Sequence, residues 1–251
     1  MSGHSKWANI KHKKDAADKK RGKVFSRLAK EIMVAAKMGG GDASANPRLR
    51  SALAAAKAVN MPNNNIERAI KKGLGELGDV VFEEILYEGY GPDGVAVLIE
   101  CLTDNRNRSA SEVRMTLDRN CGNLATSGAV SWMFHRKAHF VITGEKADEE
   151  ILMETVLDAG AEDIEVEDGV AEIWGAPEAL ETIMEALEAA GIKTEEAGLV
   201  RRPENTVNLE NVEKAQQVLR LIDRLEDLDD VQEVTANFEI DDSIADQVEI
   251  D

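Results

Sequence analysis

The sequence has 251 residues and a mass of 27.4 kDa, with 43% hydrophobic but only 4% aromatic residues. This length allows two or three domains with aliphatic cores, and no apolar run approaches the roughly 20 residues that span a bilayer, so we expect no membrane segment. A net charge of −18 disfavours a polyanion partner only if the charge is spread evenly along the chain.

The charge is in fact divided between two parts of the sequence. Residues 1–78 contain 17 basic and 6 acidic residues, a net charge of +11, whereas the remainder contains 13 basic and 42 acidic residues, a net charge of −29. Such an asymmetry is typical of a chain with one end that binds a polyanion.

Residues 1–78 are predicted to form a basic arm followed by a small helical bundle. The first 22 residues show almost no apolar periodicity, which indicates an arm. Apolar residues then recur at helical spacing over 24–36, before a run of three glycines that favours a helix end. Asn46 and Pro47 are typical of a second helix start, and Met61-Pro62 precedes a third helix that ends near Gly73.

From residue 80 the pattern changes to alternating strands and helices. Strands are expected at 82–90 and 95–103, and Ser109 with Glu112 resembles a capping box that opens a helix. Further elements are predicted downstream: strands at 129–134 and 139–143, a helix at 148–159, a strand pair around 168–169, a helix at 178–190, a strand at 193–201, a helix at 210–227 and a strand at 231–239. The order from 139 to 201 is βαββαβ, which indicates a ferredoxin-like sandwich.

No motif in the sequence has the context that catalysis or cofactor binding would require. The glycines of 73–78 match a dinucleotide-binding spacing, but they follow a helix instead of a strand, so they are interpreted as a linker. The sequence has no P-loop, and its four histidines lack partners at metal-ligand spacing. Cys101 and Cys121 form no disulfide framework and fit a reducing compartment. We expect no catalytic residues, no metal, no cofactor, no small-molecule substrate and a cytoplasmic location.

The predicted nucleic-acid-binding residues are concentrated in the arm and the first helix. Lysine and arginine neutralise backbone phosphates, and an aromatic ring among cations suits stacking on an unpaired base. The alternatives are that the basic residues form a solvated tail and that Trp7 only pins the arm to the bundle. The candidates are Lys6, Trp7, Lys11, His12, Lys13, Lys14, Lys19, Lys20, Arg21, Lys23, Arg27 and Lys30.

Arg106 and Arg108 form a second candidate site, with Arg114 and Arg119 further along the expected helix. The planar guanidinium group suits phosphate binding. The alternative is that these arginines form salt bridges to Glu112 and Asp118.

Long segments of the sequence resemble the YebC family. They are GHSKWANIKHKK at 3–14, DKKRGKVFS at 18–26, the run from 46 to 73, YEGYGPDGVAVLIE at 87–100 and TDNRNR with the following VR at 103–114. The resemblance implies an α+β protein with an N-terminal helical bundle and two α/β-sandwich domains of ferredoxin-like type. The arm and bundle would occupy 1–78, a middle domain would combine 79–134 with 203–251, and a βαββαβ domain at 135–202 would be inserted into it.

The function expected from the residues and the resemblance is nucleic-acid binding in the regulation of gene expression. Bacterial members of the family are described as DNA-binding transcriptional regulators, and others as mitochondrial translational activators or ribosome-associated factors. The leading expectation is a DNA-binding transcriptional regulator, and the alternative is an RNA-binding translation factor on the ribosome. A third class, an adaptor whose acidic domains bind basic proteins, would be favoured if the arm were dispensable.

Overall fold

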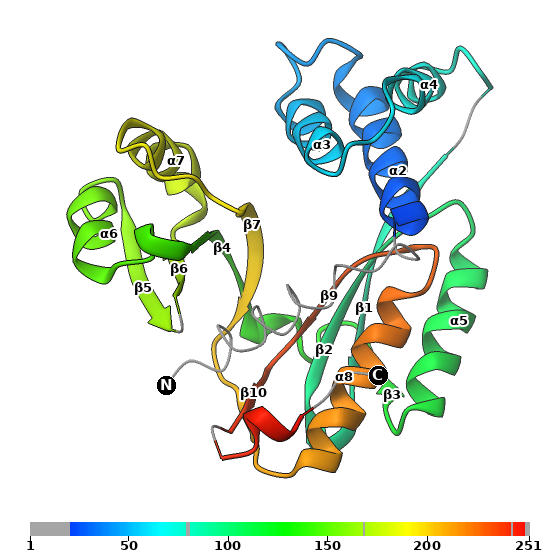
Figure 1. Ribbon diagram of the computed structural model, residues 1–251. Helices are drawn as coiled ribbons and strands as arrows, with labels where there is room; N and C mark the ends of the chain where they lie inside the picture. The colour runs from blue at the N-terminus through cyan, green and yellow to red at the C-terminus, as the bar shows by residue number, and fades with distance from the viewer. Residues whose placement is uncertain (1–20, 79–80, 168, 242, 249–251) are drawn as a thin grey trace.

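The structure of the chain, a computed structural model, describes residues 21–78, 81–167, 169–241 and 243–248. It consists of a helical bundle, a central sheet covered by two helices and a second sheet with its own helices (Figure 1). The α+β fold class, with N-terminal helices followed by sheet domains, is therefore confirmed.

The bundle contains α2 (Arg21–Gly39), α3 (Pro47–Ala58) and α4 (Asn63–Gly73). Asn46 caps α3 as predicted, because its side chain accepts a hydrogen bond from the Leu49 amide at 3.1 Å. The same side chain donates to the carbonyl of Ala35 at 2.7 Å, which ties the start of α3 to the end of α2. A Cβ at Gly73 would lie 2.3 Å from the Met33 carbonyl oxygen, so glycine permits the close approach of α4 to α2.

The central sheet has the strand order β3-β1-β2-β9 and combines two distant parts of the chain. Its strands are β1 (Glu83–Tyr90), β2 (Ala96–Thr103), β3 (Asn123–Leu124) and β9 (Val231–Ala236). The helices α5 (Arg106–Arg119) and α8 (Val212–Glu226) pack together on one face of it, and β8 (Val207–Leu209) pairs in parallel with β10 (Phe238–Ile240). Strand β2 is buried on both faces and forms the centre of this core.

The second sheet is formed by residues between β3 and β8 in the chain and has the βαββαβ order predicted from the sequence. Its elements are β4 (Phe134–Thr143), α6 (Glu149–Val156), β5 (Ala161–Glu167), β6 (Val170–Gly175), α7 (Leu180–Ala189) and β7 (Glu196–Pro203). The strand order is β5-β6-β4-β7 and all pairs are antiparallel, which is the arrangement of a ferredoxin-like sandwich.

The predicted strand at 129–134 is wrong. A short 3-10 helix (Ser131–Met133) precedes β4, which begins at Phe134. The buried carboxylate of Glu88 accepts hydrogen bonds from the amides of Gly128, Val130 and Ser131 at 2.6 to 2.8 Å. These amides are therefore bonded to a side chain and do not join a strand ladder.

Candidate nucleic-acid interface

Most of the predicted arm lies outside the described residues. The candidates concerned are Lys6, Trp7, Lys11, His12, Lys13, Lys14, Lys19 and Lys20. Arg21 is the first residue of α2. The binding role of these residues stays a prediction.

Three further candidates lie on one face of α2, at the spacing that places side chains on the same side of a helix: Lys23, Arg27 and Lys30. All three contact the turn that follows α8, at residues 226–230. Lys23 Nζ lies 2.9 Å from both the carboxylate and the carbonyl oxygen of Asp227, and Arg27 donates to the carbonyl of Glu226. The end of a helix presents unpaired carbonyl groups and a partial negative charge, which attract cations. These contacts hold the bundle against the central unit.

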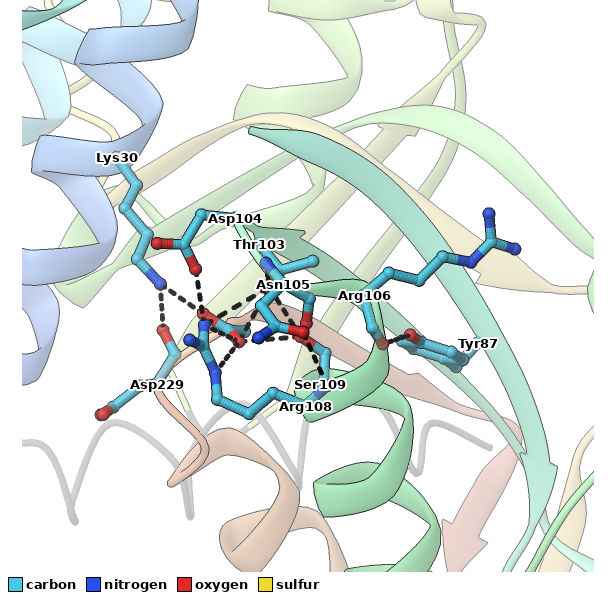
Figure 2. Close-up of polar contacts among 10 residues, drawn as sticks. Lys30, Tyr87, Thr103, Asp104, Asn105, Arg106, Arg108, Ser109 and Asp229 are labelled. Atoms are coloured by element: carbon cyan, nitrogen blue, oxygen red, sulfur yellow. Dashed lines mark hydrogen bonds and ion pairs between the residues drawn. The ribbon is translucent and has the colours of Figure 1, made fainter. Parts of the chain in front are cut away.

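Asp230 lies at the centre of a polar network that joins α2, α5 and the turn before β9. Figure 2 shows side chains of this network, among them Lys30, Arg108 and Ser109. The Asp230 side chain is only 3% exposed. It accepts hydrogen bonds from Lys30 at 2.8 Å and from Arg108 at 2.7 Å. The hydroxyl groups of Ser109 and Thr103 donate to it at 2.8 and 3.0 Å.

The electrostatics of Asp230 follow from these contacts. Burial raises the pKa of its carboxyl group, but the hydrogen bonds from Lys30, Arg108, Ser109 and Thr103 outweigh burial and hold the pKa well below its usual range. The carboxylate is thus charged at neutral pH and fixes the position of two cationic side chains from different parts of the chain.

The start of α5 also corrects the predicted capping box. The helix begins at Arg106 and is capped by Asn105, whose side chain accepts from the Arg108 amide at 3.1 Å. Ser109 lies inside the first turn, where its hydroxyl group bonds to Asp230. The Asn105 side chain was a sufficient local signal for the cap, whereas nothing near Ser109 in sequence identifies Asp230.

The two candidate arginines of α5 have different environments. Arg108 is bound to Asp230 and, at 2.8 Å, to Asp104. Arg106 extends away from this network (Figure 2), and within the part of the chain that the structure describes its side chain forms no ion pair. The predicted alternative, ion pairs to Glu112 and Asp118, does not occur among the described residues.

Further arginines are exposed along α5 beyond Arg106. Arg114 and Arg119 are exposed and have no ion pair with any described residue. Asn107 and Ser111 lie beside them on the exposed surface of the same helix. Along α5, the side chains of Arg106, Arg114 and Arg119 thus form no ion pair with any described residue.

Over the described residues, no three histidine, cysteine or acidic side chains are grouped so that they could hold a metal ion. A search of the same residues finds no helix that is both long and apolar enough to cross a membrane.

Comparisons with known proteins match nearly the whole length of the chain. Residues 5–76 match the TACO1/YebC protein N-terminal domain, and residues 82–238 match the TACO1/YebC second and third domain. A relative from Syntrophobacter fumaroxidans, named "Probable transcriptional regulatory protein", is 55% identical over 99% of this chain and 100% of its own length. A relative from Geobacter sulfurreducens, named "Probable transcriptional regulatory protein GSU1074", is also 55% identical, over 96% of each chain.

A solved structure has the same fold. It is the crystal structure of a conserved hypothetical protein, Aq1575, from Aquifex aeolicus, with a TM-score of 0.84 and 49% sequence identity over 94% of this chain and 97% of that chain. Together with the two family matches, these likenesses confirm the resemblance seen in the sequence: the chain belongs to the TACO1/YebC family.

Proposed function

We propose that this protein is a non-enzymatic regulator of gene expression that binds DNA, with the basic arm and the helical bundle contacting backbone phosphates. The observation that carries the proposal is the charge separation, +11 over residues 1–78 against −29 over the rest. The names of the relatives, probable transcriptional regulatory proteins, support a role in regulation.

The described surface indicates which cations are available to phosphate. Lys23, Arg27 and Lys30 are engaged with the turn after α8. Three basic residues on the bundle, Lys57, Arg68 and Lys71, are exposed and form no ion pair with a described residue. The same is true of Arg114 and Arg119 on α5. Phosphate binding depends on the density of such charges more than on their exact register.

The second candidate function is that of a ribosome-associated, RNA-binding translation factor. The observation that favours it is the placement of Trp7 and His12 among the arm lysines. Aromatic rings beside cations suit the unpaired bases of RNA loops better than the stacked bases of a duplex. Crosslinking in cells followed by sequencing of the attached nucleic acid distinguishes the two functions directly.

The binding experiment reverses charge in the arm of the full-length protein. Replacing Lys11, Lys13 and Lys14 by glutamate removes three phosphate contacts, so the plot of log affinity against log salt should flatten by about 2 to 3, at roughly 0.7 to 0.9 per phosphate. The control reverses two exposed lysines of the acidic part, Lys146 and Lys193, and should leave the slope unchanged. An unchanged affinity and slope in the arm variant would contradict the proposal.

Trp7→Ala separates the two nucleic acids in the same assay. A stacking role predicts a loss of about 1 to 3 kcal/mol on single strands and little change on duplex DNA. Equal losses on both would indicate that Trp7 only positions the arm.

A further inference from the structure

The second sheet has one face that carries no helix. Residues of α6 and α7 pack against alternate strand residues such as Phe140 and Ile173. Because successive strand residues point to opposite faces, His139, Glu172 and Trp174 lie on the other face of the sheet.

Five side chains form a cluster on this face. His139 Nε2 lies 3.1 Å from the carboxylate of Glu172, and its ring stacks on that of Trp174 with 4.0 Å between centroids. The Arg202 guanidinium lies over the same Trp174 ring, 4.5 Å from its centroid. It also donates to Glu165 at 2.7 Å.

The cluster contains buried polar atoms that are not satisfied. Glu172 is 2% exposed and Trp174 is 5% exposed. Within the described part of the chain, Glu172 Oε1, Glu165 Oε2 and Trp174 Nε1 have no hydrogen-bond partner. A buried polar group without a partner is costly, so these atoms point to a missing ligand.

The unsatisfied atoms define the chemistry of that ligand. Arg202 also pairs with Asp163 at 2.8 Å, so three carboxyl groups, those of Asp163, Glu165 and Glu172, surround one guanidinium group. The two free carboxylate oxygens accept hydrogen bonds, and the excess of carboxyl groups favours a charged donor such as a lysine ammonium group, which offers three N–H donors. The Trp174 N–H requires an acceptor, which the backbone carbonyl of a peptide supplies. The cluster thus fits a lysine-rich peptide segment.

We propose that this acidic face holds the chain's own residues 1–20 when no nucleic acid is bound. This segment contains six lysines and two aspartates, a net charge of +4, which complements the face. Fully extended, its 20 residues reach about 66 Å from the start of α2, at about 3.3 Å per residue. Arg201 on β7 is ion-paired to Glu100 on β2 at 2.6 Å, so this sheet is also anchored to the unit on which α2 rests.

The covalent tether favours this occupant over a basic segment of another protein. For an effective concentration on the order of 1 mM and an intrinsic Kd of about 0.1 mM, the docked form exceeds the free form about tenfold. Docking itself does not depend on the proposed function. Only its consequence does: nucleic acid and the acidic face would compete for the same lysines.

The test uses the full-length protein with a spin label at position 2. Ser2→Cys supplies the attachment point, and Cys121→Asn removes the exposed native thiol at a position with φ of 60°, which asparagine tolerates. The label should broaden the amide signals of 163–174 in nitrogen-15 spectra. Glu165→Gln with Glu172→Gln should relieve this broadening and raise the affinity for nucleic acid about tenfold, whereas the control pair Glu185→Gln with Glu188→Gln, exposed on α7, should change neither.

A second variant covers the case in which the buried substitutions disturb folding. Replacing Lys11, Lys13 and Lys14 by glutamate changes no residue of the described fold and should also relieve the broadening. Broadening that persists in this variant, or that never occurs at 163–174 in the parent, overturns the docking proposal. Broadening at 163–174 without any binding to DNA or RNA would instead contradict the proposed function and leave docking intact.

Discussion

Replacing Asp230 by alanine removes the buried carboxylate that connects α2, α5 and the turn before β9. The change leaves Lys30 and Arg108 without their shared acceptor, and the hydroxyl groups of Ser109 and Thr103 lose a partner. Breaking a buried ion pair by removing one partner costs about 3 to 5 kcal/mol. Because the Arg108 side chain is 43% exposed and retains Asp104, we expect a value near the lower end, about 3 kcal/mol.

Urea denaturation, followed by circular dichroism, measures this loss. With a slope of about 2 kcal/mol per molar, a loss of 3 kcal/mol lowers the midpoint by about 1.5 M. The matched control is Asp229→Asn, because Lys30 contacts Asp229 through its main-chain carbonyl oxygen, which the substitution retains. A midpoint shift below about 0.3 M for Asp230→Ala, or an equal shift for both variants, would refute the assigned role of the network.

The stability that Asp230 contributes depends on pH in a defined way. The pKa of Asp230 lies below its ordinary value of 3.8 in the folded protein, so the carboxylate contributes stability above that pH. The contribution is lost as the pH falls towards the folded-state pKa. The difference in stability between the parent and Asp230→Ala should therefore be constant from pH 7 to 5 and shrink in more acidic solution.

Three further predictions concern single sites. Arg106→Ala should weaken nucleic-acid binding with a change in Tm of less than about 2 °C. Arg108→Ala should lower the Tm by several degrees, because only Arg108 is bound to the buried carboxylate. Binding assays and thermal melts on both variants check this. Burial raises the pKa of the Cys101 thiol to about 12, so a thiol reagent at pH 8 should modify Cys121 rapidly and Cys101 only on unfolding. Burial raises the pKa of Glu88, but the amide hydrogen bonds outweigh burial and lower the pKa below its ordinary value of 4.5. Glu88→Gln should therefore be less stable than the parent at pH 7, and the urea midpoints of the two proteins should converge below pH 4.5.

The arm experiments and these variants address different links between structure and function. Charge reversal in the arm tests contacts with nucleic acid, and the Asp230 and Glu88 variants test the framework that presents it. A variant that changes binding without changing the urea midpoint acts at the surface, whereas one that changes both acts through the fold.

The sequence by itself determined the elements whose signals are local. The amphipathic spacing of α2, the Asn46 cap of α3 and the βαββαβ order of the second sheet all depend on residues a few positions apart. Propensity, capping and alternation act over this range, so the pattern of the chain predicts them. The separation of charge between residues 1–78 and the rest was likewise a property of the sequence alone.

Only the tertiary structure decided which cations are free. Lys30 and Arg108 meet Asp230 across sequence separations of 200 and 122 residues, and no local pattern predicts such a contact. The same holds for Glu88, whose carboxylate accepts amides about 40 residues away and prevents the expected strand at 129–134. Burying a charge is costly unless it is paired and hydrogen-bonded, and the partners come from elements that are distant in sequence but packed together in the fold. Arg106 and Arg108 are two residues apart and alike in sequence. Arg108 is bound to the buried carboxylate of Asp230, whereas Arg106 forms no ion pair with any described residue.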